Sequence, residues 1–377
     1  MTHIVINAFS AKRGGGITYL DNFLKNIPDN FNEKIILLHY TGQNFFIKNK
    51  NIIYIEFNKL FSNPFIVRIW ELFFLRFFLN KINTDIYFAP GGLISITLKK
   101  SKFKKVTMFR NMIPFDEEQK KKWPIGYART RNWLLGKTLL KSMMHADLVI
   151  FISEYGKKII LDKAKGNIKN SIVINHGVSD IFINKPIDPP SNIKKLFSED
   201  YILYPSIIDV YKSQFEVIDA YKKIMNEGVV LPKLMLVGEE YGKYSKELRR
   251  YISDNSLSDN VIITGPIKHK YMPYIYHKSI FVIYASQSEN CPNILLEAMA
   301  SKKAIICSNF QPMPEFAADC VKYFDPSKPI ELAREIKNLL NNKGLIKSLQ
   351  EKSFEESKKF NWNNAVRQTL HSLTDIK

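Results

Sequence analysis

Short apolar runs alternate with amphipathic, helix-length segments along almost the whole chain, and this alternation constrains the fold more than any other feature. Strands joined through helices pair in parallel, because each helix carries the chain back across the sheet. The pattern predicts an α/β fold with parallel sheets covered by helices on both faces. The expected strands span 3–9, 34–40, 51–57, 85–89, 104–108, 147–153, 171–175, 201–206, 233–238, 260–265, 280–286, 303–308 and 321–324.

The chain has 377 residues, which is too many for one ordinary hydrophobic core and suits two domains. A segment rich in Pro and Asn without periodicity, 184–192, predicts the linker between them. We therefore expect an N-terminal domain over 1–190, a C-terminal domain over 191–360 and a final helix within 361–377.

The composition is that of a soluble globular protein, with 45% apolar and 24% charged residues. The three cysteines, Cys291, Cys307 and Cys320, lack metal-ligand spacing, and their odd number favours a reducing compartment. The first residues, MTHIVINAF, predict a buried strand rather than a signal peptide. No His/Cys/Asp cluster has metal-ligand spacing, so neither a metal nor a cofactor is expected.

The net charge of +19 is concentrated in the first half. Residues 1–190 contain 29 Lys and Arg against 14 Asp and Glu, whereas residues 191–377 contain 26 against 22. Such a basic face attracts anionic lipid, lipid-linked phosphate or nucleic acid, although it is also compatible with an ordinary solvated surface. Nucleic acid is the least favoured partner, because no motif that reads it is recognisable.

The segment 65–82, FIVRIWELFFLRFFLNKI, is crowded with aromatic residues but is interrupted by Arg68, Glu71 and Arg76. It is too short and too charged for a membrane span. The three charged residues fall on one side of a helix, which predicts an amphipathic helix. That helix either covers the sheet or lies at a membrane surface with its Phe and Trp side chains in the leaflet.

The most informative stretch for chemistry is SENCPNILLEAMASKKAIICSN, 288–309, with Glu289 and Glu297 at a strand-to-helix junction. Ligands of open α/β sheets bind outside the carboxyl ends of strands, where helix N-termini present free N–H groups. We expect Glu289 on the loop and Glu297 in the first helical turn to face one crevice. Two carboxylates there suit hydroxyl-rich groups beside a phosphate, although they are also compatible with surface groups stabilised by the helix dipole.

Other segments also place polar groups where strands end. Gly14, Gly15 and Gly16 lie between a strand and a helix, where backbone N–H groups can approach a phosphate or sugar oxygen. They do not form the dinucleotide pattern, which disfavours a nicotinamide site. Lys212 follows strand 201–206 and can pair with a diphosphate, and Glu315 of QPMPEF follows strand 303–308. A flexible turn, a solvated lysine and a plain helix start are the alternative interpretations.

Several segments together resemble a known family. They are ADLVIFISEYGKK (146–158), VINHGVSDIF (173–182), Lys212 within YPSIIDVYKSQFEVIDAY, SENCPNILLEAMA and SNFQPMPE. The chain resembles the family 4 retaining glycosyltransferases of the GT-B fold, in the branch that builds bacterial surface polysaccharides. This resemblance implies two doubly wound, Rossmann-like domains that face a central cleft, with the acceptor bound by the N-terminal domain (1–190) and the nucleotide sugar by the C-terminal domain (191–360).

The resemblance also implies roles for individual residues. Glu297 would hold the donor ribose, Glu289 would contact the transferred sugar, and Lys212 would neutralise the diphosphate. Lys212 and Glu289 would be the catalytic pair. Backbone N–H groups of Asn290, Cys291, Pro292 and Asn293 would meet the sugar and diphosphate, the Gly14–Gly16 loop would close on the donor, and the last helix, around Trp362, would pack on the first domain.

The sequence departs from the family pattern in three places. Glu-Asn-Cys-Pro replaces the usual Glu-Gly-Phe-Gly at 289–292, and Pro-Ser-Ile at 205–207 stands where Gly-Arg is usual. Arg110 and Asn111 replace the expected His-Asp before a proline, which makes Arg110 a candidate phosphate contact. His176 is a further candidate at the edge of the interdomain crevice, although a lone histidine is more often structural.

We therefore predict a cytoplasmic, metal-independent hexosyltransferase that acts peripherally on the inner face of a bacterial plasma membrane. It would move a sugar from a nucleoside-diphosphate sugar to a lipid-linked oligosaccharide in surface-polysaccharide biosynthesis, such as that of lipopolysaccharide O-antigen or capsule. Two alternatives are a nonhydrolysing nucleotide-sugar epimerase, which needs no acceptor, and a non-catalytic protein that binds nucleotide sugars.

Overall fold

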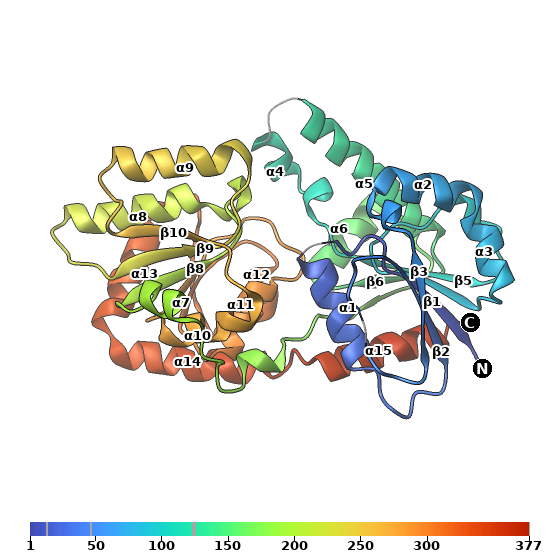
Figure 1. Ribbon diagram of the computed structural model, residues 1–377. Coiled ribbons are helices and arrows are strands. Elements are labelled where there is room, and N and C mark those ends of the chain that lie inside the picture. Colours follow the sequence, from blue (N-terminus) through green and yellow to red (C-terminus); the bar gives the residue numbers. More distant parts are fainter. Residues whose placement is uncertain (13, 46, 123–125, 377) are drawn as a thin grey trace. The chain divides into compact units, whose positions relative to one another are not determined.

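The computed structural model describes residues 1–12, 14–45, 47–122 and 126–376. The chain forms two compact units (Figure 1). The first unit contains Met1–Gly177 together with Asn361–Lys377, and the second contains Val178–Phe360.

The first unit contains a seven-stranded parallel sheet in the order β3-β2-β1-β4-β5-β6-β7. Its strands are β1 (His3–Asn7), β2 (Lys34–Tyr40), β3 (Ile52–Phe57), β4 (Ile86–Ala89), β5 (Lys104–Phe109), β6 (Leu148–Phe151) and β7 (Ser171–Val173). Its helices are α1 (Gly15–Lys25), α2 (Pro64–Phe73), α3 (Leu75–Lys81), α4 (Glu117–Lys122), α5 (Tyr127–His145), α6 (Glu154–Ala164) and α15 (Trp362–Thr374), with 3-10 turns η1 (Lys59–Ser62), η2 (Ile96–Leu98) and η3 (Ile113–Phe115).

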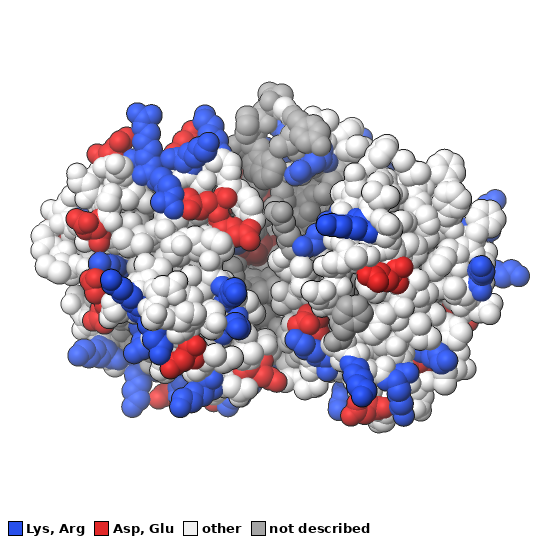
Figure 2. Space-filling model, in the orientation of Figure 1, with Lys and Arg blue, Asp and Glu red and all other residues white. Residues whose placement is uncertain are grey.

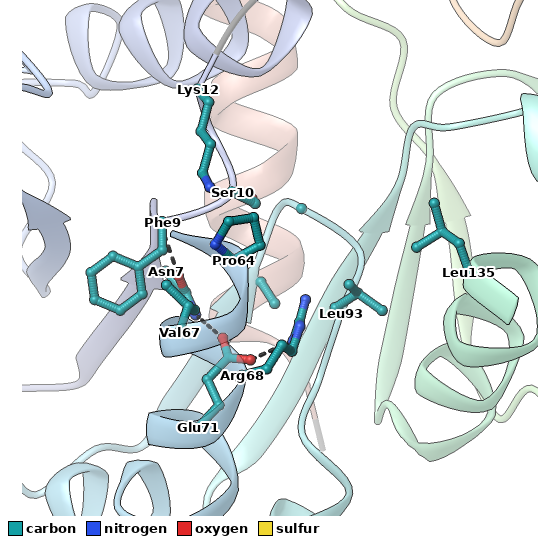
Figure 3. Close-up of a pocket in the computed structure, with 12 residues that line it drawn as sticks. Asn7, Phe9, Ser10, Lys12, Pro64, Val67, Arg68, Glu71, Leu93 and Leu135 are labelled. Carbon is teal, nitrogen blue, oxygen red and sulfur yellow. Dashed lines mark hydrogen bonds and ion pairs between the residues drawn. The ribbon is translucent and has the colours of Figure 1, made fainter. Parts of the chain in front are cut away.

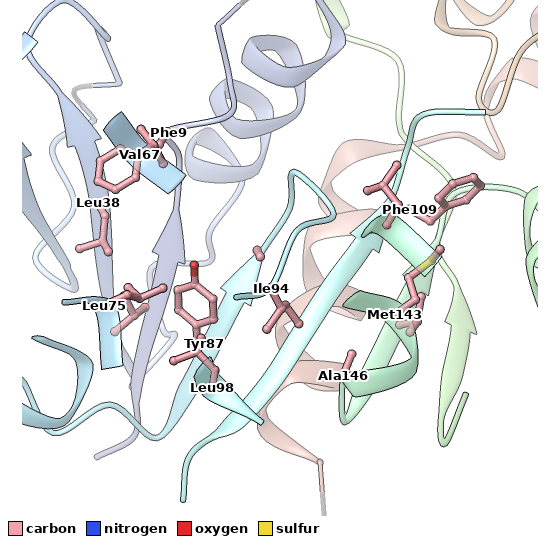
Figure 4. Close-up of a cluster of buried hydrophobic side chains, with 14 of the residues drawn as sticks. Phe9, Leu38, Val67, Leu75, Tyr87, Ile94, Leu98, Phe109, Met143 and Ala146 are labelled. Carbon is pink, nitrogen blue, oxygen red and sulfur yellow. The ribbon is translucent and has the colours of Figure 1, made fainter. Parts of the chain in front are cut away.

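Both faces of this sheet are covered, which explains the continuous apolar runs of strands such as β4 and β6. All four residues of β4 are buried. Tyr87 belongs to the apolar cluster formed with Leu75 of α3 and Met143 of α5 (Figure 4). Phe88 points to the other face and meets Phe23 of α1, with ring centroids 6.5 Å apart.

The second unit contains a six-stranded parallel sheet in the order β10-β9-β8-β11-β12-β13. Its strands are β8 (Tyr201–Pro205), β9 (Lys233–Val237), β10 (Val261–Gly265), β11 (Val282–Tyr284), β12 (Ile305–Ser308) and β13 (Lys322–Phe324). Its helices are α7 (Ser191–Leu196), α8 (Gln214–Asn226), α9 (Gly242–Asp254), α10 (Met272–Lys278), α11 (Asn293–Ala300), α12 (Met313–Ala317), α13 (Pro329–Asn341) and α14 (Lys343–Ser357), with 3-10 turns η4 (Asp180–Phe182), η5 (Val210–Lys212) and η6 (His269–Tyr271). The predicted fold class, two parallel-sheet α/β domains of Rossmann type, is confirmed.

The strand order reverses once in each sheet, between β1 and β4 in the first unit and between β8 and β11 in the second. Loops from the two central strands leave in opposite directions at such a topological switch point. The space between them, at the carboxyl ends of the strands, is where open α/β sheets bind ligands.

The predicted single helix over 65–82 is wrong, because the helical run breaks at Phe74 into α2 and α3. Glu71 does not share a polar side with Arg76, since it is buried in the interior while Arg76 is exposed. Trp70 packs against Phe57 and other aromatic rings rather than projecting from the surface. Helical periodicity cannot anticipate this arrangement, because it does not register that a buried carboxylate finds hydrogen-bond donors in the core.

The units divide at Gly177 rather than at residue 190. Phe182 follows the division and packs its ring edge-on to His269 and Tyr276, which ties the segment before the Pro-rich stretch to the second unit. Gly177 lies so close to the start of α15 that a Cβ there would be 2.2 Å from the Trp362 nitrogen. The last helix therefore belongs to the first unit, where it contacts α1.

Candidate active site

The switch point of the second unit brings together Lys212, which follows β8, and Glu289, which follows β11. The Lys212 ammonium donates a hydrogen bond to Glu289 Oε1. The hydroxyls of Tyr284 and Ser286 donate to the same oxygen, each at 2.7 Å. Only 6% of the lysine side chain and 16% of the glutamate side chain are exposed, so this is a largely buried ion pair. Two residues 77 positions apart in sequence thus form one charged cluster.

Local structure holds Lys212 in this position. Asp209 caps the turn η5 by accepting a hydrogen bond from Val210 N at 2.7 Å. The Tyr204 hydroxyl donates to the Lys212 carbonyl oxygen, and the Lys212 Nζ lies 4.9 Å from the centroid of the Tyr211 ring. The backbone and the ammonium are therefore both fixed by groups of the second unit.

Burial and the nearby Glu289 carboxylate raise the pKa of Tyr284 well above its usual value. Its hydroxyl therefore stays protonated and remains a donor to Glu289 across the physiological range. The carboxylate is held by one cation and two neutral donors. It keeps acceptor capacity, because an ionised carboxylate accepts about four hydrogen bonds.

Glu297 forms a second polar cluster on α11. It is the fifth residue of the helix, so the prediction that placed it in the first turn is wrong. His269 Nε2 lies 3.1 Å from Glu297 Oε1, and the Tyr276 hydroxyl donates to Oε2 at 3.4 Å. The hydrogen bond to Glu297 raises the pKa of His269, against the opposing effect of burial.

The stretch between Glu289 and Glu297 is more buried than expected, and it makes a backbone hydrogen bond within itself. Asn290, Cys291 and Pro292 are buried. Asn293 N donates to the Cys291 carbonyl oxygen at 2.9 Å, and proline has no N–H group. Pro292 therefore has no N–H group to offer a ligand, and the N–H group of Asn293 is engaged within the loop in this structure.

Glu315 lies in the first turn of α12, directly after β12 and the loop that follows it, and is half-buried. Because β12 is the neighbour of β11, this places Glu315 at the same edge of the sheet as Glu289. The short helix α12 packs against α11, which carries Glu297.

In the first unit, the glycine-rich loop and Arg110 come together. Gly14 has φ +52° and precedes α1 without a side-chain cap. Arg110 Nη1 donates to the Gly15 carbonyl oxygen at 3.3 Å, and the guanidinium lies 5.4 Å from the Tyr19 ring centroid. Burial lowers the pKa of Arg110 to about 10, so it remains a cation at neutral pH. Asn111 is exposed beside it.

His176 is buried between Tyr19 of α1 and Trp362 of α15, with ring centroids 5.3 Å from each. This aromatic stack joins the first and last helices of the first unit. His176 is therefore a packing residue in this structure, in agreement with the general expectation for a lone histidine.

Residues 191–359, which make up most of the second unit, match the family model described as "Glycosyl transferases group 1". The match covers nearly the whole of the second unit and does not extend to the first. This match confirms the predicted enzyme class, a glycosyltransferase.

Two curated relatives align with both units. An uncharacterized glycosyltransferase of Methanocaldococcus jannaschii is 27% identical over 255 residues, and the match spans 65% of each chain. The O-antigen chain mannosyltransferase B of Escherichia coli is 21% identical over 290 residues, covering 76% of this chain and 73% of the relative.

Among solved structures, Anabaena HepE in complex with UDP superposes with a TM-score of 0.72 at 18% identity, covering 99% of this chain and 100% of HepE. At this identity the likeness concerns the fold. Within the described ranges of this chain, no group of three or more His, Cys, Asp or Glu side chains is arranged to hold a metal ion.

Sequence reasoning missed four residues of the glycosyltransferase domain that hold the two glutamates. Tyr284 and Ser286 were within reach, because residues two apart in the predicted strand 280–286 share a face and lead directly to Glu289. His269 and Tyr276 had no comparable signal. They follow a different strand, and only the packing of η6 and α10 against α11 brings them to Glu297.

Proposed function

We propose that this protein transfers a sugar from a nucleoside-diphosphate sugar to a glycan acceptor with retention at the anomeric carbon. The observation that carries the proposal is the Lys212–Glu289 pair at the switch point of a group 1 glycosyltransferase domain. The related fold of HepE, which was solved with UDP, supports a nucleotide-sugar donor.

In the proposed mechanism, the donor diphosphate competes with Glu289 for Lys212. Once the lysine turns to the diphosphate, it stabilises the negative charge that develops on the departing nucleoside diphosphate. Glu289 remains anchored by Tyr284 and Ser286 and accepts hydrogen bonds from hydroxyls of the transferred sugar. Glu297 accepts hydrogen bonds from the ribose hydroxyls in the same way.

The transfer step balances without a co-reactant. The bond from the anomeric carbon to the diphosphate oxygen breaks, and a bond to the acceptor oxygen forms on the same face of the sugar. The acceptor proton passes to the leaving phosphate oxygen. Catalysis then consists mainly of positioning and of charge stabilisation by Lys212. We propose that no metal or cofactor is needed, which predicts that EDTA leaves the rate unchanged.

We further propose that the acceptor is a lipid-linked glycan of surface-polysaccharide biosynthesis, reached at an anionic membrane surface. The first support is a set of large apolar side chains that α2, the break and α3 leave exposed: Phe65, Ile69, Leu72, Phe73, Phe74 and Phe77. Figure 2 shows an uncharged surface over α2, with Lys and Arg side chains at its rim near α3. Arg76 donates to the Lys100 carbonyl oxygen at 3.4 Å, which brings the basic stretch 99–102 beside α3.

The second support is the E. coli relative, whose name assigns it to the O-antigen chain. Among the residues that the structure describes, no helix has the length and apolar character that crossing a bilayer requires. If these exposed side chains contact the membrane, the double variant Phe73→Ser/Phe77→Ser should co-sediment less with anionic liposomes. Its melting temperature should stay unchanged. Equal co-sedimentation of this variant and the wild type would count against membrane contact.

The donor is tested with a thermal-shift panel of UDP-, GDP- and dTDP-sugars on the full chain. A ligand at one hundred times its Kd stabilises the protein by about 2.7 kcal/mol, which gives a clear shift. Hits are then incubated with bacterial lipid extract, and the products are identified by mass spectrometry. A panel in which no nucleotide sugar raises the melting temperature contradicts the proposal, and conversion of the donor without acceptor indicates an epimerase instead.

A further inference from the structure

A second polar cluster lies at the switch point of the first unit, which none of the roles above uses. A cavity of about 390 Å³ lies between the loops that follow β1 and β4, with α2 and α5 as its other walls (Figure 3). Its volume falls within the range of about 300–1,000 Å³ that is typical of ligand pockets. The cavity therefore occupies the place in this sheet that corresponds to the Lys212–Glu289 site in the other.

A buried carboxylate lines this cavity. Glu71 of α2 is only 3% exposed. Asn7 Nδ2 donates to Glu71 Oε1 at 2.9 Å, and the Arg68 guanidinium pairs with Oε2. Burial raises the pKa of Glu71, against the opposing effects of Arg68 and Asn7.

Burying a carboxylate is costly unless it is paired, and an apolar residue would join α2 to the sheet at less cost. Two hydrogen bonds leave about half of the acceptor capacity of Glu71 unused. A carboxylate in this state recognises hydroxyl groups, as Glu289 is proposed to do.

The cavity is shaped by a close approach of two loops. A Cβ at Gly91 would lie 2.0 Å from Ser10 Oγ, so the loop after β4 can meet the loop after β1 only through glycine. Ser10 and Lys12 add a hydroxyl and an ammonium to the cavity wall, and Phe9 and Leu93 add apolar surface. This mixture of a carboxylate, hydroxyl and apolar walls suits a sugar ring, which has polar edges and an apolar face.

A second cavity of about 270 Å³ shares Arg68, Glu71 and Leu93 with the first and continues along α5. Lys141 and His145 line it. Burial lowers the pKa of His145, and the charges of Lys99 and Lys141 act in the same direction. Leu72 and Ile96, both exposed, form its apolar margin.

We propose that these two cavities together form the acceptor site, called here the acceptor groove. The sugar of the acceptor lies in the first cavity, with hydroxyls on Glu71. A phosphate lies over Arg68 and Lys141 in the second, and the lipid leaves past Leu72 and Ile96. The order of carboxylate, cations and exposed apolar side chains along the groove matches the order of sugar, phosphate and lipid in a lipid-linked glycan.

This inference rests on the proposed function, so its test is direct binding rather than turnover. The probes are hexosyl- and N-acetylhexosaminyl-diphosphocitronellols, compared with the corresponding methyl glycosides by isothermal titration calorimetry on the full chain. The variants are Glu71→Gln, Lys141→Ala and Leu93→Trp, which narrows the junction of the cavities. The matched controls are Glu56→Gln on β3 and Lys137→Ala, one turn before Lys141 on α5; neither control lines the groove.

We expect wild-type protein to bind at least one diphosphate probe and Glu71→Gln to raise its Kd about tenfold or more, since one charge-assisted hydrogen bond is lost. Lys141→Ala weakens the diphosphate probe but not the methyl glycoside. Leu93→Trp weakens the binding of both the diphosphate probe and the methyl glycoside. The two control variants bind both probes with wild-type Kd values, and all variants bind the nucleotide sugar with the wild-type Kd.

The groove is refuted if no probe binds, or if the three variants bind the probes as the controls do. If Glu71→Gln lowers the melting temperature and weakens the binding of donor and probe equally, Glu71 has a purely structural role. The effects of Leu93→Trp and Lys141→Ala on probe binding then decide whether the groove binds the acceptor. Probe binding that depends on Glu71 in a protein that binds no nucleotide sugar would refute the proposed function and leave the groove standing.

Discussion

The ion pair between Lys212 and Glu289 allows a quantitative prediction. Lys212→Met keeps most of the lysine's volume but leaves the Glu289 carboxylate without its cation. Breaking a buried ion pair by removing one partner costs about 3–5 kcal/mol. Because Tyr284 and Ser286 still donate to Glu289, we expect a smaller loss of about 2–3 kcal/mol in the stability of the second unit.

A double-mutant cycle separates this interaction from its surroundings. Glu289→Gln should cost a similar amount, because it leaves a buried ammonium, and the double variant should cost clearly less than the sum of the two. The loss of about 2–3 kcal/mol expected for Lys212→Met corresponds to a roughly 30- to 140-fold loss of hydrogen-exchange protection in peptides from β8 and β11.

The chain provides its own control for this measurement. All four tryptophans lie outside residues 178–360, so tryptophan fluorescence follows the first unit, whose unfolding should not change. Additive losses in the cycle, or exchange that changes equally in both units, would contradict a stabilising ion pair between Lys212 and Glu289. In the transfer assay, loss of the lysine should lower kcat about 100- to 1,000-fold, by analogy with removing one donor to a developing charge; unchanged turnover would exclude its catalytic role.

Three further predictions concern other parts of the molecule. Glu297→Ala should raise the donor Kd about tenfold or more in calorimetry, and an unchanged Kd would exclude its assigned contact with the ribose. Because the pKa of His269 is raised in the folded protein, its contribution to stability is complete below its unfolded pKa of about 6.5 and is lost as the pH rises through the folded value; melting temperatures from pH 5 to 9 should show this decline in wild type and not in Glu297→Gln. Gly177→Ala should destabilise the first unit by about 1–3 kcal/mol in urea unfolding followed by tryptophan fluorescence, because the new methyl group would overlap Trp362; a wild-type midpoint would contradict that close approach.

The local pattern of apolar and polar residues was sufficient to predict much of the fold. Each expected strand exists, and none extends more than one residue beyond its predicted range, since a strand covered on both faces is a short apolar run between polar turns. The positions of Lys212 and Glu289, each just after a strand, were also predictable, because in a parallel sheet the ends of all strands meet at one edge.

Contacts between distant segments were not predictable in this way. The end of the first unit at Gly177 depends on where Phe182 packs, and the partners of Glu297 come from η6 and α10. The buried Glu71 carboxylate accepts a hydrogen bond from Asn7, which is 64 residues away in sequence.

The strands, the helices between them and the class of chemistry that two carboxylates and a lysine suggest can be read from the amino-acid sequence, because these follow from side-chain type and spacing over a few residues. The pairing of Lys212 with Glu289, and the position of Glu71 in a cavity wall beside Arg68, became visible in the folded protein. The physical reason is that the state of a charged side chain depends on its burial and its nearest charges, and folding brings those from segments that lie far apart along the chain.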